Sequence, residues 1–222
     1  MRFFTQVLAT ILGLFAFSFL FILFFIVMIA AVGGSESDVK PLTDNTVITF
    51  TEKEINVPII LMGYMNPVLQ FGFERFCKEA AAVGVDGLIL PDLPEYEFET
   101  EYGAIIKANG LDFIFLVTPE TSEERIEKLD SLSTGFLYAV SSSSTTGSNQ
   151  NMTDVNAYLL KLKNMQLKNP VLVGFGIKDK QTFDTACANS NGAIIGTAYI
   201  KALDGTDDIV GTTKRFLSGV LS

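Results

Sequence analysis

The chain has 222 residues, a formal net charge of −9 and no histidine. The acidic balance excludes nucleic acid as an expected partner, because phosphate backbones are bound by basic faces. The lack of histidine excludes Ser-His-Asp and Cys-His catalysis and histidine-ligated zinc. The length suits one domain with an appendage. Cys77 and Cys187 show no metal spacing, and we expect two buried structural thiols without a disulfide.

The amino-terminal segment is apolar and contains no charged residue from Val7 to Val32. As a helix it would span roughly 39 Å at about 1.5 Å per residue, and the hydrocarbon core of a bilayer is about 30 Å thick. Residues 1–34 are therefore predicted to be a transmembrane anchor. A cleaved signal peptide is the alternative, but its apolar region should be shorter. Arg2 precedes the run, so the positive-inside rule places the rest of the chain outside the cytoplasm.

Residues 35–56 are predicted to be a linker, in which Asn45 to Phe50 could form one short strand. The first 50 residues resemble the membrane leader and first strand of protease IV-type signal peptide peptidases. The resemblance is carried by Phe3-Phe4, Leu8-Ala9-Thr10, Leu12-Gly13, the phenylalanine-rich run and Asp44-Asn45-Thr46-Val47. The Ser and Lys catalytic region of that family has no counterpart in this chain.

From Val57 onward, short apolar strands alternate with amphipathic helices. This rhythm predicts a parallel sheet in an α/β fold. The strands are apolar throughout, as expected when both faces of a sheet are covered. Six strand–helix units fit better as the larger part of a (β/α)8 barrel than as an open sheet. The predicted strands are 58–64, 87–91, 112–117, 135–140, 170–175 and 193–196.

The helices are predicted from apolar residues that recur at helical spacing. Glycines after two of them, Gly84 and Gly110, are typical helix ends. Thr121 or Ser122 can cap the helix after the third strand. The last helix should end near Leu221. The apolar faces are Phe73, Phe76, Cys77, Ala80 and Ala81; Phe98, Tyr102, Ile105 and Ile106; and Val155, Tyr158, Leu159 and Leu162.

Three loops after successive predicted strands could bind phosphate. They are Ser141 to Gly147, Gly174 to Ile177, and Gly196-Thr197. Backbone N–H groups in glycine-containing loops and at helix starts suit anions, and barrel phosphate sites typically follow strands seven and eight. A Ser/Thr run alone predicts a linker, and Gly-x-Gly alone a turn. The three loops together predict a phosphate site.

A set of ordered motifs from about Val57 to Ser222 resembles the tryptophan synthase alpha subunit. These motifs are Pro58-Ile59-Ile60-Leu61-Met62-Gly63-Tyr64-Met65-Asn66-Pro67, Gly84-Val85-Asp86-Gly87-Leu88-Ile89-Leu90-Pro91-Asp92-Leu93-Pro94, Thr118-Pro119, Tyr138, Thr146-Gly147, Gly174-Phe175-Gly176-Ile177 and Gly196-Thr197-Ala198. The resemblance implies a (β/α)8 barrel that cleaves indole-3-glycerol phosphate by a retro-aldol reaction. The products are indole and glyceraldehyde 3-phosphate. Indole then passes to a pyridoxal-phosphate-dependent beta subunit.

The resemblance also implies roles for individual residues. The phosphate would be held by Gly147, Gly176, Gly196 and Thr197; the indole and glycerol pocket would be lined by Met62, Ile89, Tyr138 and Phe175; and the beta subunit would be faced by Asn66, Pro67, Asp92 and Pro94. Thr146 would belong to a loop that closes over the site and excludes water. Met62 and Ile89 are most simply core residues. For Asp92, a loop, capping or partner role is favoured over catalysis. No cofactor or metal is expected.

The family's catalytic glutamate, and the aspartate of its Pro-Phe-Ser-Asp-Pro motif, have no counterpart in this chain. Residues 57–222 are therefore predicted to be a partial barrel, equivalent to strands three to eight, joined to a foreign leader and impaired in catalysis. One alternative is a non-catalytic, membrane-tethered module that binds a phosphorylated ligand or the beta subunit. Another is a chimera created by gene prediction or assembly. The leader predicts membrane anchoring, whereas the resemblance predicts a cytoplasmic protein.

Overall fold

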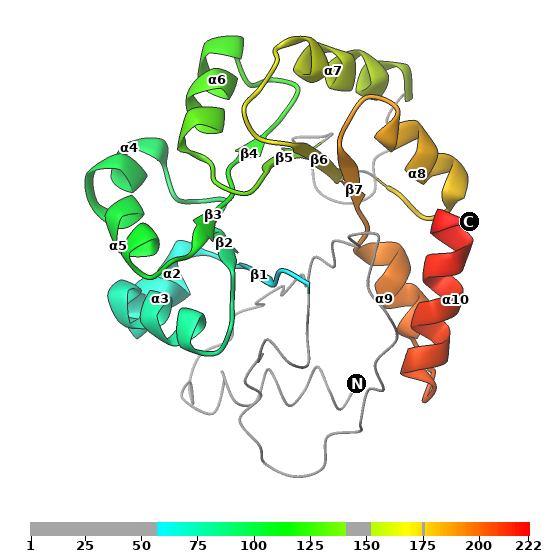
Figure 1. Ribbon diagram of the computed structural model, residues 1–222, viewed down its shortest axis with the longest axis horizontal. Helices are drawn as coiled ribbons and strands as arrows, with labels where there is room; N and C mark the ends of the chain where they lie inside the picture. The colour runs from blue at the N-terminus through cyan, green and yellow to red at the C-terminus, as the bar shows by residue number, and fades with distance from the viewer. Residues whose placement is uncertain (1–56, 141–151, 175) are drawn as a thin grey trace.

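A computed structural model describes residues 57–140, 152–174 and 176–222 of the chain. In this part, short strands form an arc surrounded by helices (Figure 1). The predicted anchor of residues 1–34, and the predicted linker with its strand at Asn45 to Phe50, lie outside the described residues. Within the described ranges, no helix is long and apolar enough to cross a bilayer.

Every strand pairing in the described residues is parallel, as the sequence predicts. The strands are β1 (Ile60–Met62), β2 (Gly87–Ile89), β3 (Asp112–Phe113), β4 (Leu116–Val117), β5 (Leu137–Val140), β6 (Val171–Gly174) and β7 (Gly192–Ile194). They form one sheet of order β1-β2-β3 and a second of order β4-β5-β6-β7. Each crossover between neighbouring strands carries helix, which is the α/β architecture expected.

The prediction of a single strand over 112–117 was wrong, because β3 pairs with β2 whereas β4 pairs with β5. The change of neighbour occurs between Ile114 and Phe115. The Ile114 N–H donates to the Leu88 carbonyl at 3.0 Å, and the Phe115 carbonyl accepts from the Tyr138 N–H at 3.0 Å. Such staggered pairing is what strand tilt produces in a barrel wall. The two sheets therefore continue into one another, and β1 and β7 end the described arc.

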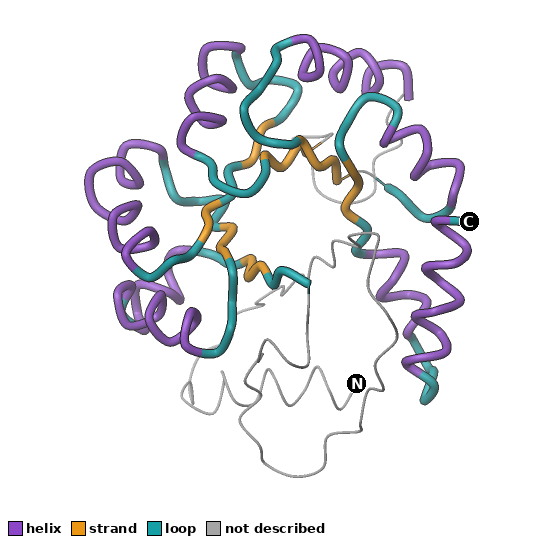
Figure 2. Tube along the Cα trace, in the orientation of Figure 1, coloured by secondary structure: helices purple, strands orange, loops and turns teal. Residues whose placement is uncertain are grey.

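The helices lie outside the arc of strands (Figure 2). They are α2 (Met65–Phe71), α3 (Phe73–Ala82), α4 (Glu95–Glu97), η1 (Phe98–Tyr102), α5 (Gly103–Ala108), α6 (Glu123–Leu132), α7 (Met152–Asn164), α8 (Lys180–Cys187), α9 (Thr197–Leu203) and α10 (Ile209–Leu221). The predicted ends at Gly84 and Gly110 are confirmed, because these glycines have φ of +87° and +70°. The Ser122 side chain caps α6 by accepting from the Arg125 N–H. Helix α2 was not predicted.

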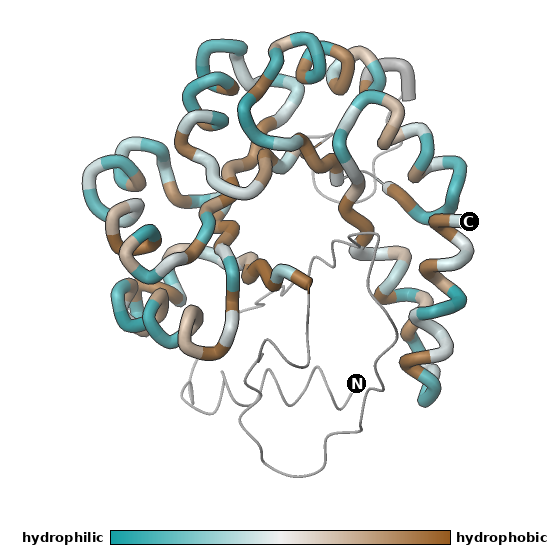
Figure 3. The backbone as a smooth tube through the Cα atoms, viewed as in Figure 1, coloured by the Kyte–Doolittle hydropathy of each residue, from teal (hydrophilic) through white to brown (hydrophobic). Residues whose placement is uncertain are grey.

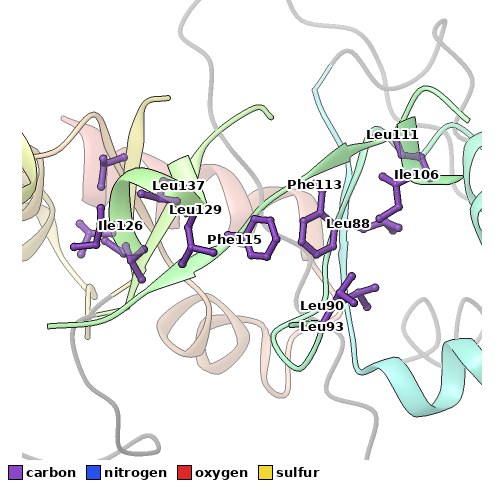
Figure 4. Close-up of a cluster of buried hydrophobic side chains, with 14 of the residues drawn as sticks. Leu88, Leu90, Leu93, Ile106, Leu111, Phe113, Phe115, Ile126, Leu129 and Leu137 are labelled. Carbon is purple, nitrogen blue, oxygen red and sulfur yellow. The ribbon is translucent and has the colours of Figure 1, made fainter. Parts of the chain in front are cut away.

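Hydrophobic residues are concentrated along the strands, and hydrophilic residues are frequent along the helices (Figure 3). The buried hydrophobic side chains of the strands and helices pack into one layer. Leu88, Phe113 and Phe115 lie at the centre of this layer (Figure 4). The Phe98 ring from η1 packs on the rings of both phenylalanines, with centroids 4.8 and 5.0 Å away. Buried apolar area is the main source of stability in such a fold. Packing in this layer therefore fixes the positions of the strands and of their carboxyl ends.

The two cysteines differ in burial. Cys77, on α3, is fully buried, as predicted, and burial raises the pKa of its thiol to about 11. Cys187, at the end of α8, is only partly buried, so the prediction of two buried thiols was wrong for this residue. It is the last residue of a helix whose one buried residue is Ala186. No disulfide joins the two thiols.

A buried polar network ties α6 to the loop before β6. The Asp130 carboxylate accepts from the Lys168 N–H at 2.6 Å and from the Asn169 N–H at 3.0 Å. The Asn169 side-chain amide donates to the Asp130 carbonyl and to the Ser133 carbonyl. All three side chains are at least nine-tenths buried. Buried polar groups are tolerated when they are hydrogen-bonded in this way, so the network holds β6 in register with the helix that precedes β5.

Candidate functional site

A small apolar cluster occupies the inner side of the arc of strands. Its buried members are Ile60, Ile89, Ile114, Phe136 and Leu172, and its partly buried members are Met62, Leu116, Tyr138 and Ile194. They come from alternate positions along the strands, because successive side chains of a strand point to opposite faces. Three predicted pocket residues, Met62, Ile89 and Tyr138, are thus brought together on the inner side. None of these nine side chains is a carboxylate.

The inner cluster becomes more exposed toward the carboxyl ends of the strands. On β1, Ile60 is 5% exposed and Met62, two residues later, is only partly buried. Phe136, directly before β5, is 4% exposed, and Tyr138 on β5 is partly buried. Ligands of parallel α/β folds bind at the carboxyl ends of the strands. The apolar inner face therefore opens at the end where a ligand is expected.

Tyr138 lies against Gly174, which ends the neighbouring strand β6. A Cβ added at Gly174 would lie 2.8 Å from the Cζ atom of the Tyr138 ring, which is too close for an unshifted side chain. Burial raises the pKa of the Tyr138 phenol above its ordinary value, so the hydroxyl stays neutral and can donate or accept a hydrogen bond. Gly174 was named in the sequence motif but not as a site residue. The spacing of the tyrosine and the glycine along the chain does not show that the two are in contact.

Two of the predicted phosphate loops lie at adjacent strand ends. Strands β6 and β7 pair with Gly174 opposite Ile194. Gly176 lies two residues after Gly174, and Gly196 lies two residues after Ile194, so both glycines follow the same edge of the sheet. Gly176 has φ of +40°, and nothing lies within 4 Å of where its Cβ would be. Gly196 is the N-cap of α9, which begins at Thr197 and has no side-chain cap. Open backbone N–H groups at one edge of a sheet suit an anion.

Three further predicted site residues, Thr146, Gly147 and Phe175, lie outside the described residues. The described part of the site therefore consists of the inner cluster and the ends of β6 and β7. Among the described residues, no group of three or more metal-ligating side chains could hold a metal ion.

The four residues predicted to face a partner lie on two neighbouring segments beyond β1 and β2. Asn66 and Pro67 are in the first turn of α2, and Asp92 and Pro94 follow β2. Both carboxylate oxygens of Asp92 lie 3.0 Å from the Met65 backbone nitrogen. Asp92 thus accepts from the first backbone N–H of α2, which is a capping contact. Capping is one of the three roles, loop, capping or partner contact, that the sequence favoured over catalysis. The motif sequence alone does not show which amide it binds.

An arc of parallel strands with helices outside it defines the class of protein: an α/β fold of the (β/α)-barrel type. Residues 40–217 match the family model described as tryptophan synthase alpha chain. This chain belongs to the tryptophan synthase alpha chain family. The match starts inside the segment 35–56 that the sequence analysis treats as a linker.

Curated relatives agree with the family assignment. The tryptophan synthase alpha chain of Bacteroides thetaiotaomicron is 45% identical over 157 residues, covering 70% of this chain and 61% of the relative. That of Flavobacterium johnsoniae is 51% identical over 152 residues, covering 68% of this chain and 60% of the relative. The chain therefore spans about three fifths of the length of these relatives.

Solved structures agree with the fold. The tryptophan synthase alpha subunit of Pyrococcus furiosus superposes with a TM-score of 0.66 at 31% sequence identity. The superposition covers 77% of this chain and 69% of that structure.

Proposed function

We propose that the described barrel is a tryptophan synthase alpha-type lyase domain that binds indole-3-glycerol phosphate at the carboxyl ends of its strands. The observation that carries the proposal is the apolar inner face of Met62, Ile89 and Tyr138, beside the glycine turns at Gly176 and Gly196. An aromatic ring fits the first part and a phosphate the second. A ligand that carries both groups would fill the two together.

The retro-aldol reaction needs two proton movements. The bond between indole C3 and the first glycerol carbon breaks, and ring carbon C3 gains a proton. The hydroxyl on that glycerol carbon loses a proton and becomes the aldehyde of glyceraldehyde 3-phosphate. Tyr138, kept neutral by burial, and the inner isoleucines would position the ring and exclude water, but they supply no carboxylate. The family's glutamate and aspartate would supply proton transfer and charge stabilisation.

General acid–base catalysis contributes about 10²- to 10⁴-fold to a rate. Because this chain carries no counterpart of the two carboxylates, we expect it to bind the substrate and to release indole at least about 100-fold more slowly than a complete alpha chain. The test is a time course of indole release from indole-3-glycerol phosphate, with a complete alpha chain as the positive control. A rate close to that of the control would contradict the expected impairment.

The binding part of the proposal has its own test. Gly196→Asp places a carboxylate at the expected phosphate position, so like-charge repulsion should weaken binding of indole-3-glycerol phosphate by at least about tenfold. The matched control is Gly219→Asp on α10, where nothing lies within 4 Å of the added Cβ and where binding should be unchanged. Equal affinities for the two variants would contradict the proposed phosphate position.

A second candidate function is a non-catalytic module that binds a phosphorylated ligand or a beta subunit. The observation that favours it is that the chain carries no counterpart of the family's catalytic glutamate and aspartate. The two functions are separated by the same time course. Slow indole release above the uncatalysed rate supports the lyase, whereas ligand binding with no release above that rate supports the module. Co-purification with a beta subunit from detergent extracts would support the membrane-tethered form of the module.

A further inference from the structure

Helix α2 carries half of the predicted partner surface but has few anchors of its own. It has seven residues, of which only Met65 and Val68 are buried. Its N-cap residue, Tyr64, makes no side-chain capping bond, and the Tyr64 side chain is 54% exposed. Helices this short are marginal in isolation and take their stability from contacts with the rest of the fold. The position of Asn66 and Pro67 therefore depends on what fixes the start of α2.

The segment after β2 is, by contrast, firmly held. The Leu93 N–H donates to the Leu90 carbonyl at 3.0 Å, which closes a tight turn around Asp92. Leu90 and Leu93 are 3% and 4% exposed and both belong to the outer core layer. The turn is thus anchored at both ends, and it presents the Asp92 side chain on a rigid base.

Two hydrogen bonds link the start of α2 and the residues before it to β2 and the turn that follows β2. The Gly63 N–H donates to the Ile89 carbonyl at 3.0 Å, and the Met65 N–H donates to the Asp92 carboxylate, 3.0 Å from each oxygen. The second bond is charge-assisted, and it places a negative charge at the positive end of the helix dipole, which is the favourable arrangement. Asp92 is exposed to solvent, yet its carboxylate is already bonded within the chain.

We infer that Asp92 is a positioning residue: it fixes the start of α2 against the turn after β2, so that Asn66, Pro67 and Pro94 form one preformed surface for the beta subunit. The inference rests on the second candidate function, the module that binds a beta subunit, because it takes the beta subunit as the partner. It differs from the role that the sequence resemblance implies, in which Asp92 itself contacts the partner.

The first experiment measures amide hydrogen exchange in the full chain without any partner. In Asp92→Ala, the amides of residues 63–72 should exchange about tenfold faster, which corresponds to about 1.4 kcal/mol of lost local stability. Asp92→Asn keeps an acceptor oxygen and should restore most of the protection. Asp179→Ala removes the matched cap of α8, where the carboxylate accepts from the Thr182 N–H at 2.9 Å, and should leave residues 63–72 unchanged. Unchanged exchange of this segment in Asp92→Ala would overturn the inference.

The second experiment is a double-mutant cycle on affinity for a beta subunit. If Asp92 acts by positioning α2, then Asp92→Ala should weaken binding about tenfold, and adding Asn66→Ala should weaken it by less than the product of the two single losses. Asp179→Ala should bind normally. Strictly additive losses would overturn positioning and indicate two independent contacts. If the unaltered chain fails to bind a beta subunit, the proposed partner is wrong, while the exchange experiment still decides the role of Asp92.

Discussion

Strand β2, inside the arc, and strand β7, at its end, differ in how well they are covered. All three residues of β2 are buried, whereas none in β7 is fully buried. Helix α3 buries Phe73, Cys77 and Ala80, whereas α9 buries no residue. In the described part, β2 has two strand neighbours and β7 has one. An apolar strand is therefore buried only where neighbouring strands and helices cover it on both sides.

The largest expected effect is a contrast in stability between the interior strand β2 and helix α9, which follows the end strand β7. Leu88→Ala on β2 removes a fully buried side chain and should lower the free energy of unfolding by about 2–5 kcal/mol. Ile200→Ala on α9, where the side chain is 49% exposed, should lower it by less than about 0.5 kcal/mol. Urea denaturation of both variants is the measurement. Equal losses would show that α9 is as well covered as β2.

The network around Asp130 provides a test in the region between β2 and β7, because it ties α6 to the loop before β6. Asp130→Ala leaves the Lys168 and Asn169 amides without their acceptor and should cost about 2–3 kcal/mol of unfolding free energy. The control is Asp184→Ala, which removes an exposed pair with Lys180 and should cost less than about 0.5 kcal/mol. A small loss in Asp130→Ala would mean that β6 holds its register without the network.

Gly174→Ala tests the contact between β5 and β6 at the site itself. The new Cβ would meet the Tyr138 ring, so the ring must move, at a cost of about 1–3 kcal/mol for overpacking. Binding of indole-3-glycerol phosphate should weaken together with stability. Adding Tyr138→Phe removes the hydroxyl oxygen, which is the nearest atom to the new Cβ, but leaves the ring carbons, so it should restore only part of the lost stability. Complete restoration would place the conflict at the hydroxyl alone, and no restoration would place it at the ring.

The smallest expected effect is a difference in thiol chemistry. Partly buried Cys187 should react with a thiol reagent at least about tenfold faster than fully buried Cys77 at pH 8. Because burial raises the pKa of Cys77 from 9.0 to about 11, the unfolded state loses this proton first as pH rises. The thiol's contribution to stability is therefore complete below about pH 9 and lost between pH 9 and 11. Cys77→Ala should remove that pH dependence, and faster reaction of Cys77 would contradict the burial contrast.

The sequence predicted the elements that have a long apolar period. The faces of α3 and α7, the burial of Cys77 and the parallel strands follow from such patterns. Helix α2 could not be predicted in this way, because seven residues with Pro67 near the start carry too short a period. The division of 112–117 between β3 and β4 depends on which strands lie on either side, and that is a property of the whole barrel.

Site residues were predictable to a similar extent. The motifs predicted Met62, Ile89 and Tyr138 as pocket residues, and the structure brings all three into one apolar cluster. Their contact with a ligand stays a prediction. The contact of Gly174 with the Tyr138 ring, and the bond from Met65 to Asp92, join residues 36 and 27 positions apart. Neither contact has a local signal in the sequence, since each depends on how two neighbouring strands are aligned.

The most direct test of the central claim is a titration of the labelled chain with indole-3-glycerol phosphate, followed by the backbone amide resonances. The account predicts saturable shifts of the Gly176, Gly196 and Thr197 amides, with smaller shifts of the Tyr138 amide. Inorganic phosphate should shift the first three and leave Tyr138 unchanged. Shifts confined to other parts of the described barrel, or no saturable shift at all, would contradict a ligand site at the carboxyl ends of β6 and β7.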